Sequence, residues 1–164
     1  MTIVAGSLIV RDNKILMVQE AKKSCYGQWN FPAGHVDEKE LITDAAIRET
    51  FEETGCKIKL TGVLPISTVV LPNGETVVIV KFMADVIEEN IKIDKSEQLD
   101  VQWLDLNKVK NMTENELRGY DTALNDIKNM ENGKIYPLDL FDNKIYRRWL
   151  NVWDNLFEIR KFFI

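Results

Sequence analysis

Three glutamates near the end of a stretch without Gly or Pro are the residues best placed for chemistry. Glu49, Glu52 and Glu53 are spaced i, i+3 and i+4, so on a helix their carboxylates project within an arc of about 100°. Like charges on one face repel one another, and Arg48, one turn before Glu52, neutralises only part of that charge. A run of this kind is often a solvated acidic helix face, and that interpretation competes with a metal site.

The apolar residues around these glutamates favour the metal site. The side of the helical wheel that carries the glutamates also carries Leu41, Ile42, Ala45 and Ala46. Ile47 and Phe51 lie opposite. A helix that is apolar on both sides is usually packed between two layers, so its carboxylates are partly desolvated and need a cation. Hard oxygen ligands, with waters completing the shell, suit Mg²⁺ or Mn²⁺ bound together with a phosphate substrate.

The segment from Gly34 to Cys56 resembles the Nudix box. That pattern runs Gly, five residues, Glu, seven residues, Arg-Glu, a bulky apolar residue, one residue, Glu-Glu, one residue, Gly and an apolar residue. The matching positions are Gly34, Glu40, Arg48, Glu49, Thr50, Glu52, Glu53, Gly55 and Cys56. Thr50 and Cys56 are less bulky than the pattern asks, and every charged and glycine position is met. The resemblance covers roughly residues 3–130 and implies the α/β Nudix fold, an α/β/α sandwich with a mixed central sheet and a catalytic loop-helix-loop.

The resemblance also implies a role for each charged position. The metal ligands would be Glu49, Glu52 and Glu53. Arg48 would orient a glutamate through an ion pair, and Glu40 would support or extend the metal shell. Divalent metals held there would clamp a diphosphate and lower the pKa of an attacking water. The general base varies among family members, and the candidates are Glu53 and Glu97; an ordinary exposed loop carboxylate is an equally good interpretation of Glu97.

Four residues outside the acidic run are candidates for substrate contacts: Trp29, Phe31, Gly34 and Lys81. The two aromatic rings can stack on a base, although packing beneath the helix explains them equally well. Lys81 is a candidate phosphate contact, whereas solvated surface is favoured for Lys22 and Lys23. His35 is the single histidine, which argues against a Ser-His-Asp or zinc site and favours a turn residue.

The family resemblance implies a Mg²⁺-dependent hydrolase (or Mn²⁺-dependent) that cleaves phosphoanhydride bonds in a nucleotide or related pyrophosphate. A narrower resemblance is to the bacterial phosphatase branch, which acts on nucleoside di- and triphosphates and on a pyrimidine pyrophosphate. It rests on three short matches: Trp29-Asn30, Pro32-Ala33-Gly34-His35 and Tyr136-Pro137-Leu138.

Two alternatives stay open. Pro72, sixteen residues beyond Cys56, marks ADP-ribose hydrolases of the family, and an ADP-ribose or dinucleotide pyrophosphatase is therefore one of them. Turn chemistry in Leu71-Pro72-Asn73-Gly74 explains the proline more simply. The other alternative is a non-catalytic Nudix domain that senses a nucleotide, although such a domain usually lacks a box glutamate.

The elements that must position these residues are predicted from periodicity and turn signals. Apolar runs at 3–10 and 14–19, joined by Arg11-Asp12-Asn13, predict a hairpin. A helix is expected from about Glu38 to Thr54, capped by Gly55. Further strands are expected at 57–70, 76–87 and 101–104, and the capping-box spacing at 113–116 predicts a helix to about Met130.

Composition narrows the function classes. The 164 residues carry a net charge of −5, so the chain has no basic field for a nucleic-acid backbone. The opening apolar run lacks a basic n-region and is too short to span a bilayer, which predicts a cytoplasmic protein. Cys25 and Cys56 have no CxxC spacing and are interpreted as free thiols.

The domain is expected to span residues 1–143, followed by an amphipathic aromatic extension over 144–164. Its apolar residues recur at helical spacing at Ile145, Trp149, Val152, Trp153, Leu156 and Phe157. One interpretation is a helix packed on the domain's own core. The other is a lid, or a contact that makes a homodimer, because so large an apolar surface usually has a partner. Truncation at Asn143 followed by light scattering distinguishes a dimer from a monomer.

Overall fold

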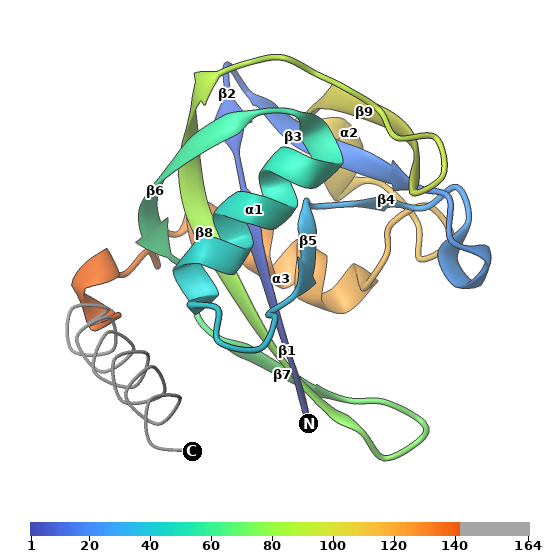
Figure 1. The fold of residues 1–164 in the computed structure, drawn as a ribbon. Coiled ribbons are helices and arrows are strands. Elements are labelled where there is room, and N and C mark those ends of the chain that lie inside the picture. Colours follow the sequence, from blue (N-terminus) through green and yellow to red (C-terminus); the bar gives the residue numbers. More distant parts are fainter. Residues whose placement is uncertain (142–164) are drawn as a thin grey trace, which may run out of the picture.

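Two β-sheets and three α-helices make up the part of the chain that the computed structural model describes, residues 1–141 (Figure 1). The first sheet consists of β1 (Thr2–Leu8), β5 (Ala33–His35), β6 (Lys57–Val63), β7 (Ser67–Val70) and β8 (Thr76–Glu88). The second consists of β2 (Val10–Arg11), β3 (Lys14–Glu20), β4 (Trp29–Asn30) and β9 (Gln98–Asp105). The helices are α1 (Ile42–Thr54), α2 (Leu106–Lys110) and α3 (Tyr120–Glu131), with short 3-10 turns at Lys23–Cys25 and Leu138–Leu140.

The first sheet is mixed, and its order is β5-β1-β8-β6, with β7 paired to part of β8. β1 and β8 are parallel, whereas β5, β6 and β7 pair antiparallel to their neighbours. α1 covers one face of this sheet and α3 covers the other (Figure 1). The predicted α/β class with a mixed sheet is therefore confirmed.

Each face of the first sheet has its own hydrophobic core. Ala45 and Ala46 of α1 pack with Val80 and Phe82 of β8 in one cluster. Ile127 of α3 packs in the other cluster, together with residues of β1, β3 and the loop that carries Phe31. The sheet thus separates α1 from α3, and anything built on α3 lies on the opposite face from the acidic helix.

The predicted hairpin between 3–10 and 14–19 is correct only at its tip. Val10 and Arg11 pair with Ile15 and Lys14, but β1 leaves this sheet and becomes a central strand of the other. Ala5–Leu8 are buried without alternation, which is the pattern of a strand covered on both faces. Continuous burial, rather than the polar turn, decides where β1 pairs.

Three other boundaries differ from the prediction. The strand expected at 57–70 is two strands, separated by Leu64-Pro65-Ile66, because proline lacks the N–H that a ladder requires. Thr113 and Glu116 make the capping contacts, yet these close a single turn, and α3 begins only at Tyr120 after Gly119 adopts a φ of +59°. α2 was not predicted. β9 is longer than expected, running over Gln98–Asp105.

α1 begins at Ile42, four residues later than predicted, because Lys39 has a φ of +65° and interrupts helical geometry. It ends as predicted at Gly55, whose φ is +75° and whose N–H donates to the Phe51 carbonyl. The prediction that α1 is covered on both sides is wrong. Phe51 is 49% exposed and Ile47 is 38% exposed, so only the alanine side of the helix is packed.

Thr50 explains why the box tolerates a small residue at that position. Its hydroxyl lies 2.6 Å from the Ser7 hydroxyl of β1, and both groups are fully buried. A polar contact replaces the bulky apolar side chain of the pattern and joins α1 to the central strand. Cys25 and Cys56 are buried free thiols, as predicted.

The aromatic extension predicted at 144–164 lies outside the described residues, and its dimer or lid role stays a prediction.

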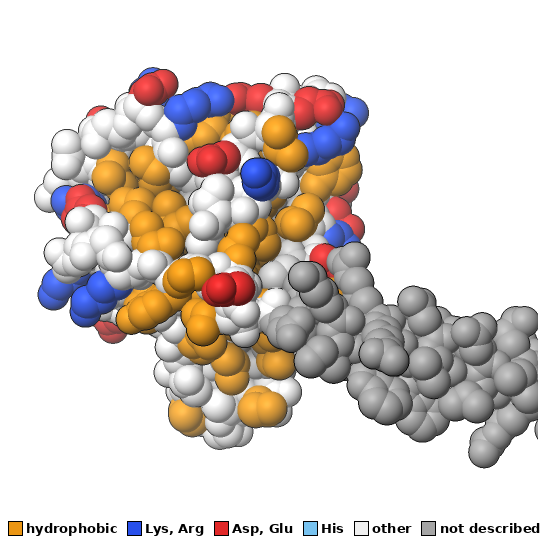
Figure 2. Space-filling view, turned by 90° about the vertical axis from the view of Figure 1, so that its left-hand side faces the viewer, with side chains coloured by type: hydrophobic (Ala, Val, Ile, Leu, Met, Phe, Trp, Pro, Cys, Tyr) orange, Lys and Arg blue, Asp and Glu red, His pale blue; other side chains and the backbone are white. Residues whose placement is uncertain are grey.

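Near residue 141 the surface has a hollow of about 520 Å³ lined by Val63, Leu64, Pro65, Ile66, Tyr136, Leu140 and Phe141. The face turned 90° from the first view shows hydrophobic side chains gathered across its middle (Figure 2). Among residues 1–141 no helix is long and apolar enough to cross a membrane.

Candidate active site

Arg48 holds a cluster of carboxylates on α1 and the loop before it. Its Nε and Nη2 donate to both oxygens of Glu40 at 2.7 and 2.8 Å, and its Nη1 donates to Glu49 at 2.7 Å and to Glu52 at 2.9 Å. Nη2 also donates to the His35 carbonyl, at 3.1 Å. The hydrogen bonds from Arg48 lower the pKa of Glu40, and those to Glu40, Glu49 and Glu52 raise the pKa of Arg48. One guanidinium therefore fixes the positions of three carboxylates.

Gly34 lets α1 approach the edge strand β5. A Cβ built at this position would lie 2.2 Å from the Glu49 carboxylate, well inside van der Waals contact. Any side chain here would displace Glu49. The glycine that opens the box is thus required by the close approach of a carboxylate to a strand.

Glu53 is the one glutamate of the three that Arg48 does not bind. It is 6% exposed, and its Oε2 accepts a hydrogen bond of 2.9 Å from the Ala33 N–H. Burial raises its pKa to about 7, and the carboxylates of Glu20 and Glu49 add to this effect, while the Ala33 bond opposes it. A carboxylate with a pKa near the working pH is well suited to act as a general base.

Glu20, at the end of β3, is a candidate site residue that the sequence analysis missed. Its buried carboxylate accepts hydrogen bonds from Asn30 and from Arg118, and it lies close enough to Glu53 to perturb its pKa. The predicted strand ended one residue earlier, at Gln19. A glutamate in register with the buried residues of an apolar strand was the available signal, because such a carboxylate needs a partner inside the fold.

Glu97 is placed differently from Glu53. It is exposed in the turn before β9, and its main-chain carbonyl accepts a hydrogen bond of 3.1 Å from the N–H of Ala21. Through this bond the Glu97 backbone lies beside the end of β3. Glu97 and Glu20 thus differ: the Glu97 side chain is exposed, whereas the Glu20 carboxylate is buried next to Glu53.

The donor set of α1 fits a hard divalent cation. In residues 1–141, no three acidic, His or Cys side chains are already gathered closely enough to hold a metal. Each of the three glutamates, however, uses one carboxylate oxygen in a hydrogen bond, so within the described chain Glu49 Oε2, Glu52 Oε1 and Glu53 Oε1 accept none. Mg²⁺ and Mn²⁺ prefer such oxygens, and rotation of these side chains would let them converge on an ion.

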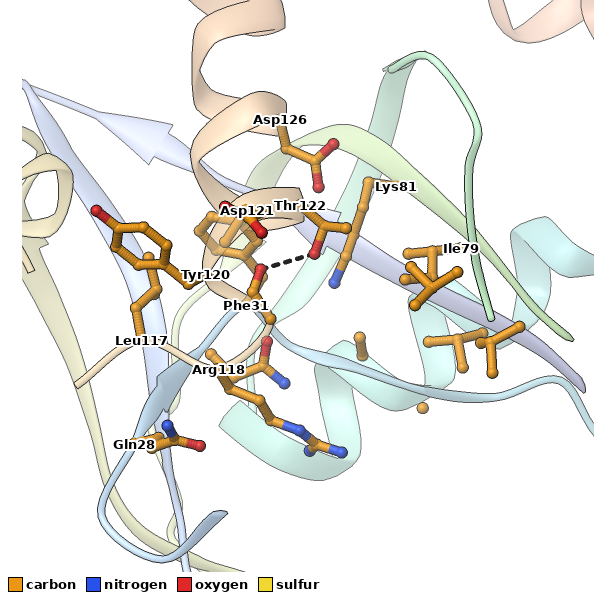
Figure 3. A pocket seen from close by; sticks show the side chains of 18 of the residues that line it. Gln28, Phe31, Ile79, Lys81, Leu117, Arg118, Tyr120, Asp121, Thr122 and Asp126 are labelled. Atoms are coloured by element: carbon orange, nitrogen blue, oxygen red, sulfur yellow. Dashed lines mark hydrogen bonds between the residues drawn. The ribbon is translucent and has the colours of Figure 1, made fainter. Parts of the chain in front are cut away.

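A cavity of about 700 Å³ opens on the α3 face of the first sheet (Figure 3). Ala33, Gly34 and His35 line it, and the same three residues contact the cluster described above, through Glu53, Glu49 and Arg48 respectively. The cavity and the glutamates of α1 therefore adjoin one another across β5. A molecule that reached both would place one end in the cavity and the other against the carboxylates.

The structure brings three of the four predicted substrate-contact residues to this cavity: Phe31, Gly34 and Lys81. Trp29 is not among its lining residues; it bridges to Leu117 and packs on the α3-side core. Lys22 reaches the cavity rim with an exposed side chain. Pro72 lies in the turn between β7 and β8, where Gly74 N–H donates to the Leu71 carbonyl, so turn geometry accounts for it.

The chain matches the family model of the NUDIX domain over residues 1–123. It is 32% identical over 123 residues to "Putative nudix hydrolase 1" of Caenorhabditis elegans, an alignment that covers 72% of this chain and 32% of that protein. It is 47% identical over 53 residues to "8-oxo-dGDP phosphatase NUDT18" of Danio rerio, which covers 32% of this chain and 16% of that protein. The chain thus spans a third or less of the length of these relatives.

A solved structure of a NUDIX hydrolase from Nitrosomonas europaea has the same fold. Its TM-score is 0.78, its sequence identity is 26%, and the superposition covers 86% of this chain and 95% of the other. The Arg48 cluster, the buried Glu53 and the cavity all lie within or beside the matched residues. On the sequence match to residues 1–123 and on the fold, the chain belongs to the Nudix family.

Proposed function

We propose that this chain is a cytoplasmic, Mg²⁺- or Mn²⁺-dependent hydrolase that cleaves a phosphoanhydride bond in nucleoside di- or triphosphates, or in related organic pyrophosphates. The observation that carries the proposal is the contact of cavity and acidic helix across Ala33-Gly34-His35. A nucleotide has a ring at one end and a diphosphate at the other. The cavity suits the first and a metal-loaded cluster of glutamates suits the second.

In this mechanism Glu49, Glu52 and Glu53 would hold the cation, and Glu40 would support the metal shell through Arg48. When bound, the divalent ion neutralises phosphate charge and acidifies water. Arg48 orients Glu49 and Glu52 through ion pairs of 2.7 and 2.9 Å. Without the cation and Arg48, the phosphoryl groups of the substrate would meet a cluster of carboxylates of the same charge.

Glu53 is the favoured general base among the box residues. In the metal-free chain burial gives it a pKa of about 7, and its Ala33 bond leaves Oε1 free. That oxygen can accept a proton where it does not bind the cation, so the role of base requires that Glu49 and Glu52 hold the ion without it. Glu97, the other candidate, is an exposed residue of the turn before β9. Buried Glu20 forms an ion pair with the partly exposed Arg118, which positions Arg118 at the cavity wall.

The phosphatase named for the zebrafish relative supports a nucleoside diphosphate as substrate, although only 16% of that protein is matched. The ADP-ribose or dinucleotide pyrophosphatase stays the alternative; Pro72, its sequence signal, belongs to a turn and is not among the residues that line the cavity. A nucleotide-sensing domain stays a second candidate only if hydrolysis is absent.

The test is product analysis with Mg²⁺ over nucleoside di- and triphosphates, ADP-ribose, diadenosine polyphosphates and thiamine-type pyrophosphates. Glu53→Gln serves as the blank. Glu131→Gln serves as the matched control, because Glu131 is a surface residue paired with Lys110, far in sequence from the box.

Phosphate release from nucleotides that requires Mg²⁺, is lost in Glu53→Gln and is retained in Glu131→Gln supports the proposal. AMP together with ribose phosphate would instead establish the ADP-ribose alternative. Tight binding of one compound without turnover of any would contradict hydrolysis and support a sensor.

A further inference from the structure

Two buried charges on opposite walls of the cavity have no role in the mechanism above. Lys81 extends from β8 and is 7% exposed, and Asp126 extends from α3 and is 2% exposed. Both line the cavity, and Figure 3 shows Asp126 next to the upper end of Lys81. They lie 45 residues apart in the chain and meet only because α3 covers this face of the sheet.

Neither charge is satisfied by the part of the chain that the structure describes. Within residues 1–141, Lys81 and Asp126 make no ion pair of 4.0 Å or less and no side-chain hydrogen bond, and the Lys81 ammonium faces the Phe31 ring at 5.5 Å. Burial lowers the pKa of Lys81 to about 8 and raises that of Asp126 to about 6, as expected for charged groups that have lost water. An ammonium and a carboxylate in this state are costly unless a ligand supplies their hydrogen bonds.

The wall around them is apolar and suits a flat ring. Val77 and Ile79 of β8, Val4 of β1 and Leu117 line the cavity beside Phe31. A planar heterocycle between such side chains is held by its faces, so its polar edge must be matched by charged groups of the lining, which include Arg118 and Asp121 as well as Lys81 and Asp126. Lys81 supplies hydrogen-bond donors there and Asp126 supplies acceptors.

We propose that Lys81 and Asp126 select the nucleobase. The ammonium of Lys81 donates to a ring carbonyl oxygen, and the carboxylate of Asp126 accepts from an exocyclic amino group on the same edge of the ring. Guanine and cytosine type bases carry both groups. Adenine has no carbonyl for Lys81, and uracil, thymine and hypoxanthine have no amino group for Asp126. The inference rests on the proposed function, in that the cavity holds the base of a nucleotide.

Binding and turnover test this separately. The dissociation constants of GMP, CMP, AMP, UMP and IMP are measured by titration calorimetry without metal, and kcat/KM is then measured for the corresponding diphosphates with Mg²⁺. For the unaltered protein we expect GMP and CMP to bind at least about tenfold more tightly than the other three, since a matched pair of polar contacts to a base edge discriminates by about tenfold or more. The same order is expected in kcat/KM.

The variants are Asp126→Asn and Lys81→Met, and their matched controls are Asp85→Asn and Lys59→Met, which change exposed residues of β8 and β6. Asp126→Asn is expected to remove the preference for GMP over IMP, which differ only in the amino group. Lys81→Met is expected to remove the preference for guanosine over 2,6-diaminopurine riboside monophosphate, which replaces the carbonyl by an amino group. The controls are expected to keep both preferences.

Equal binding of all five monophosphates, or none, overturns the inference even if diphosphates are hydrolysed. A Lys81→Met variant that loses kcat/KM by the same factor on every base also overturns it, because Lys81 would then contact phosphate. If no diphosphate is hydrolysed, the proposed function fails, while a selective, Asp126-dependent affinity for GMP and CMP would still support the inference.

Discussion

The Arg48 cluster and the cavity wall handle buried charge in opposite ways. At Arg48, three carboxylates share one guanidinium through bonds of 2.7 to 2.9 Å, and the pKa of Glu40 is lowered. Around the cavity, the pKa values of Glu53 and Asp126 are raised to about 7 and 6, and that of Lys81 falls to about 8. In the first region the protein itself supplies a cationic partner to each carboxylate, although the single charge of Arg48 balances only part of theirs. In the second region Lys81 and Asp126 have no ion-pair partner within the described residues, which is the arrangement expected where a ligand binds.

The largest effect should come from the glutamate that Arg48 does not hold. Glu53→Gln is expected to lower kcat by about 10²–10⁴-fold, the usual contribution of a general base, because an amide cannot accept the proton. Phosphate release measures it, with Glu131→Gln as the control. A loss of less than tenfold in Glu53→Gln would remove Glu53 from the role of base.

Removing the guanidinium of Arg48 should destabilise the cluster of carboxylates around it. Arg48→Met leaves Glu40, Glu49 and Glu52 facing one another, and we expect the free energy of unfolding at pH 7.5 to fall by about 1–2 kcal/mol, because these ion pairs are only partly buried. The pKa of Glu40 is lowered in the folded state, so this contribution is present above the unfolded value of 4.5 and is lost as the pH falls through the folded value. The penalty should therefore shrink in acid.

Urea denaturation at pH 7.5 and pH 3.5 measures both quantities. Lys110→Met is the control, since it breaks a single surface ion pair and should cost less than about 1 kcal/mol. Added Mn²⁺ should stabilise Arg48→Met more than the unaltered protein, because the ion replaces a missing positive charge. A penalty for Arg48→Met that does not change with pH would mean that packing, not charge, had been lost.

In the second region, replacing a charged residue by a neutral one should stabilise the fold, whereas Arg48→Met destabilises it. The unfolded chain releases the Glu53 proton near pH 4.5, whereas the folded chain keeps it to about pH 7, so ionised Glu53 opposes folding above pH 7. Glu53→Gln, measured without metal, should raise the free energy of unfolding at pH 8 by about 2 kcal/mol and change it little at pH 4.5. Thermal or urea unfolding at the two pH values tests this. A destabilised variant at pH 8 would show that the Ala33 bond outweighs burial.

The smallest expected effect comes from a substitution at Gly34, which lies between the Arg48 cluster and the cavity. Gly34→Ala inserts a methyl group where the Glu49 carboxylate lies, and the side chain can rotate away at little cost in stability. We expect a change of less than about 1 kcal/mol in unfolding and about a tenfold weaker affinity for Mn²⁺, measured by calorimetry. Gly74→Ala, in the turn between β7 and β8, provides a glycine control far from the carboxylates. Unchanged Mn²⁺ affinity would exclude Glu49 as a ligand.

What the sequence predicts well is what lies close together along the chain. The box places Glu49, Glu52 and Glu53 within five residues, and Gly55 ends the helix where a left-handed residue is required. Glu20, Lys81 and Asp126 come from three elements far apart in sequence, and each is an ordinary residue type in an ordinary strand or helix. Their burial depends on how α3 covers the sheet, which no local pattern specifies.

Turn signals failed where tertiary packing had a stronger preference. The capping contacts of Thr113 and Glu116 are real, yet they precede α3 by a full turn and a left-handed glycine. The polar turn after β1 joins β2 to β3, while β1 itself pairs with β8 because its side chains are buried on both faces. Local signals located the turns, and burial selected the partners.

The placement of α1 and α3 on opposite faces of one sheet has an evolutionary consequence. A substitution at Asp126 or elsewhere on the inner side of α3 alters which molecule is held, and it lies on the opposite face of the sheet from α1. Proteins descended from such a chain can therefore change which ligand the cavity recognises while they keep the same glutamates on α1. Changes confined to Ala33-Gly34-His35 have no such freedom, because this strand serves both faces at once.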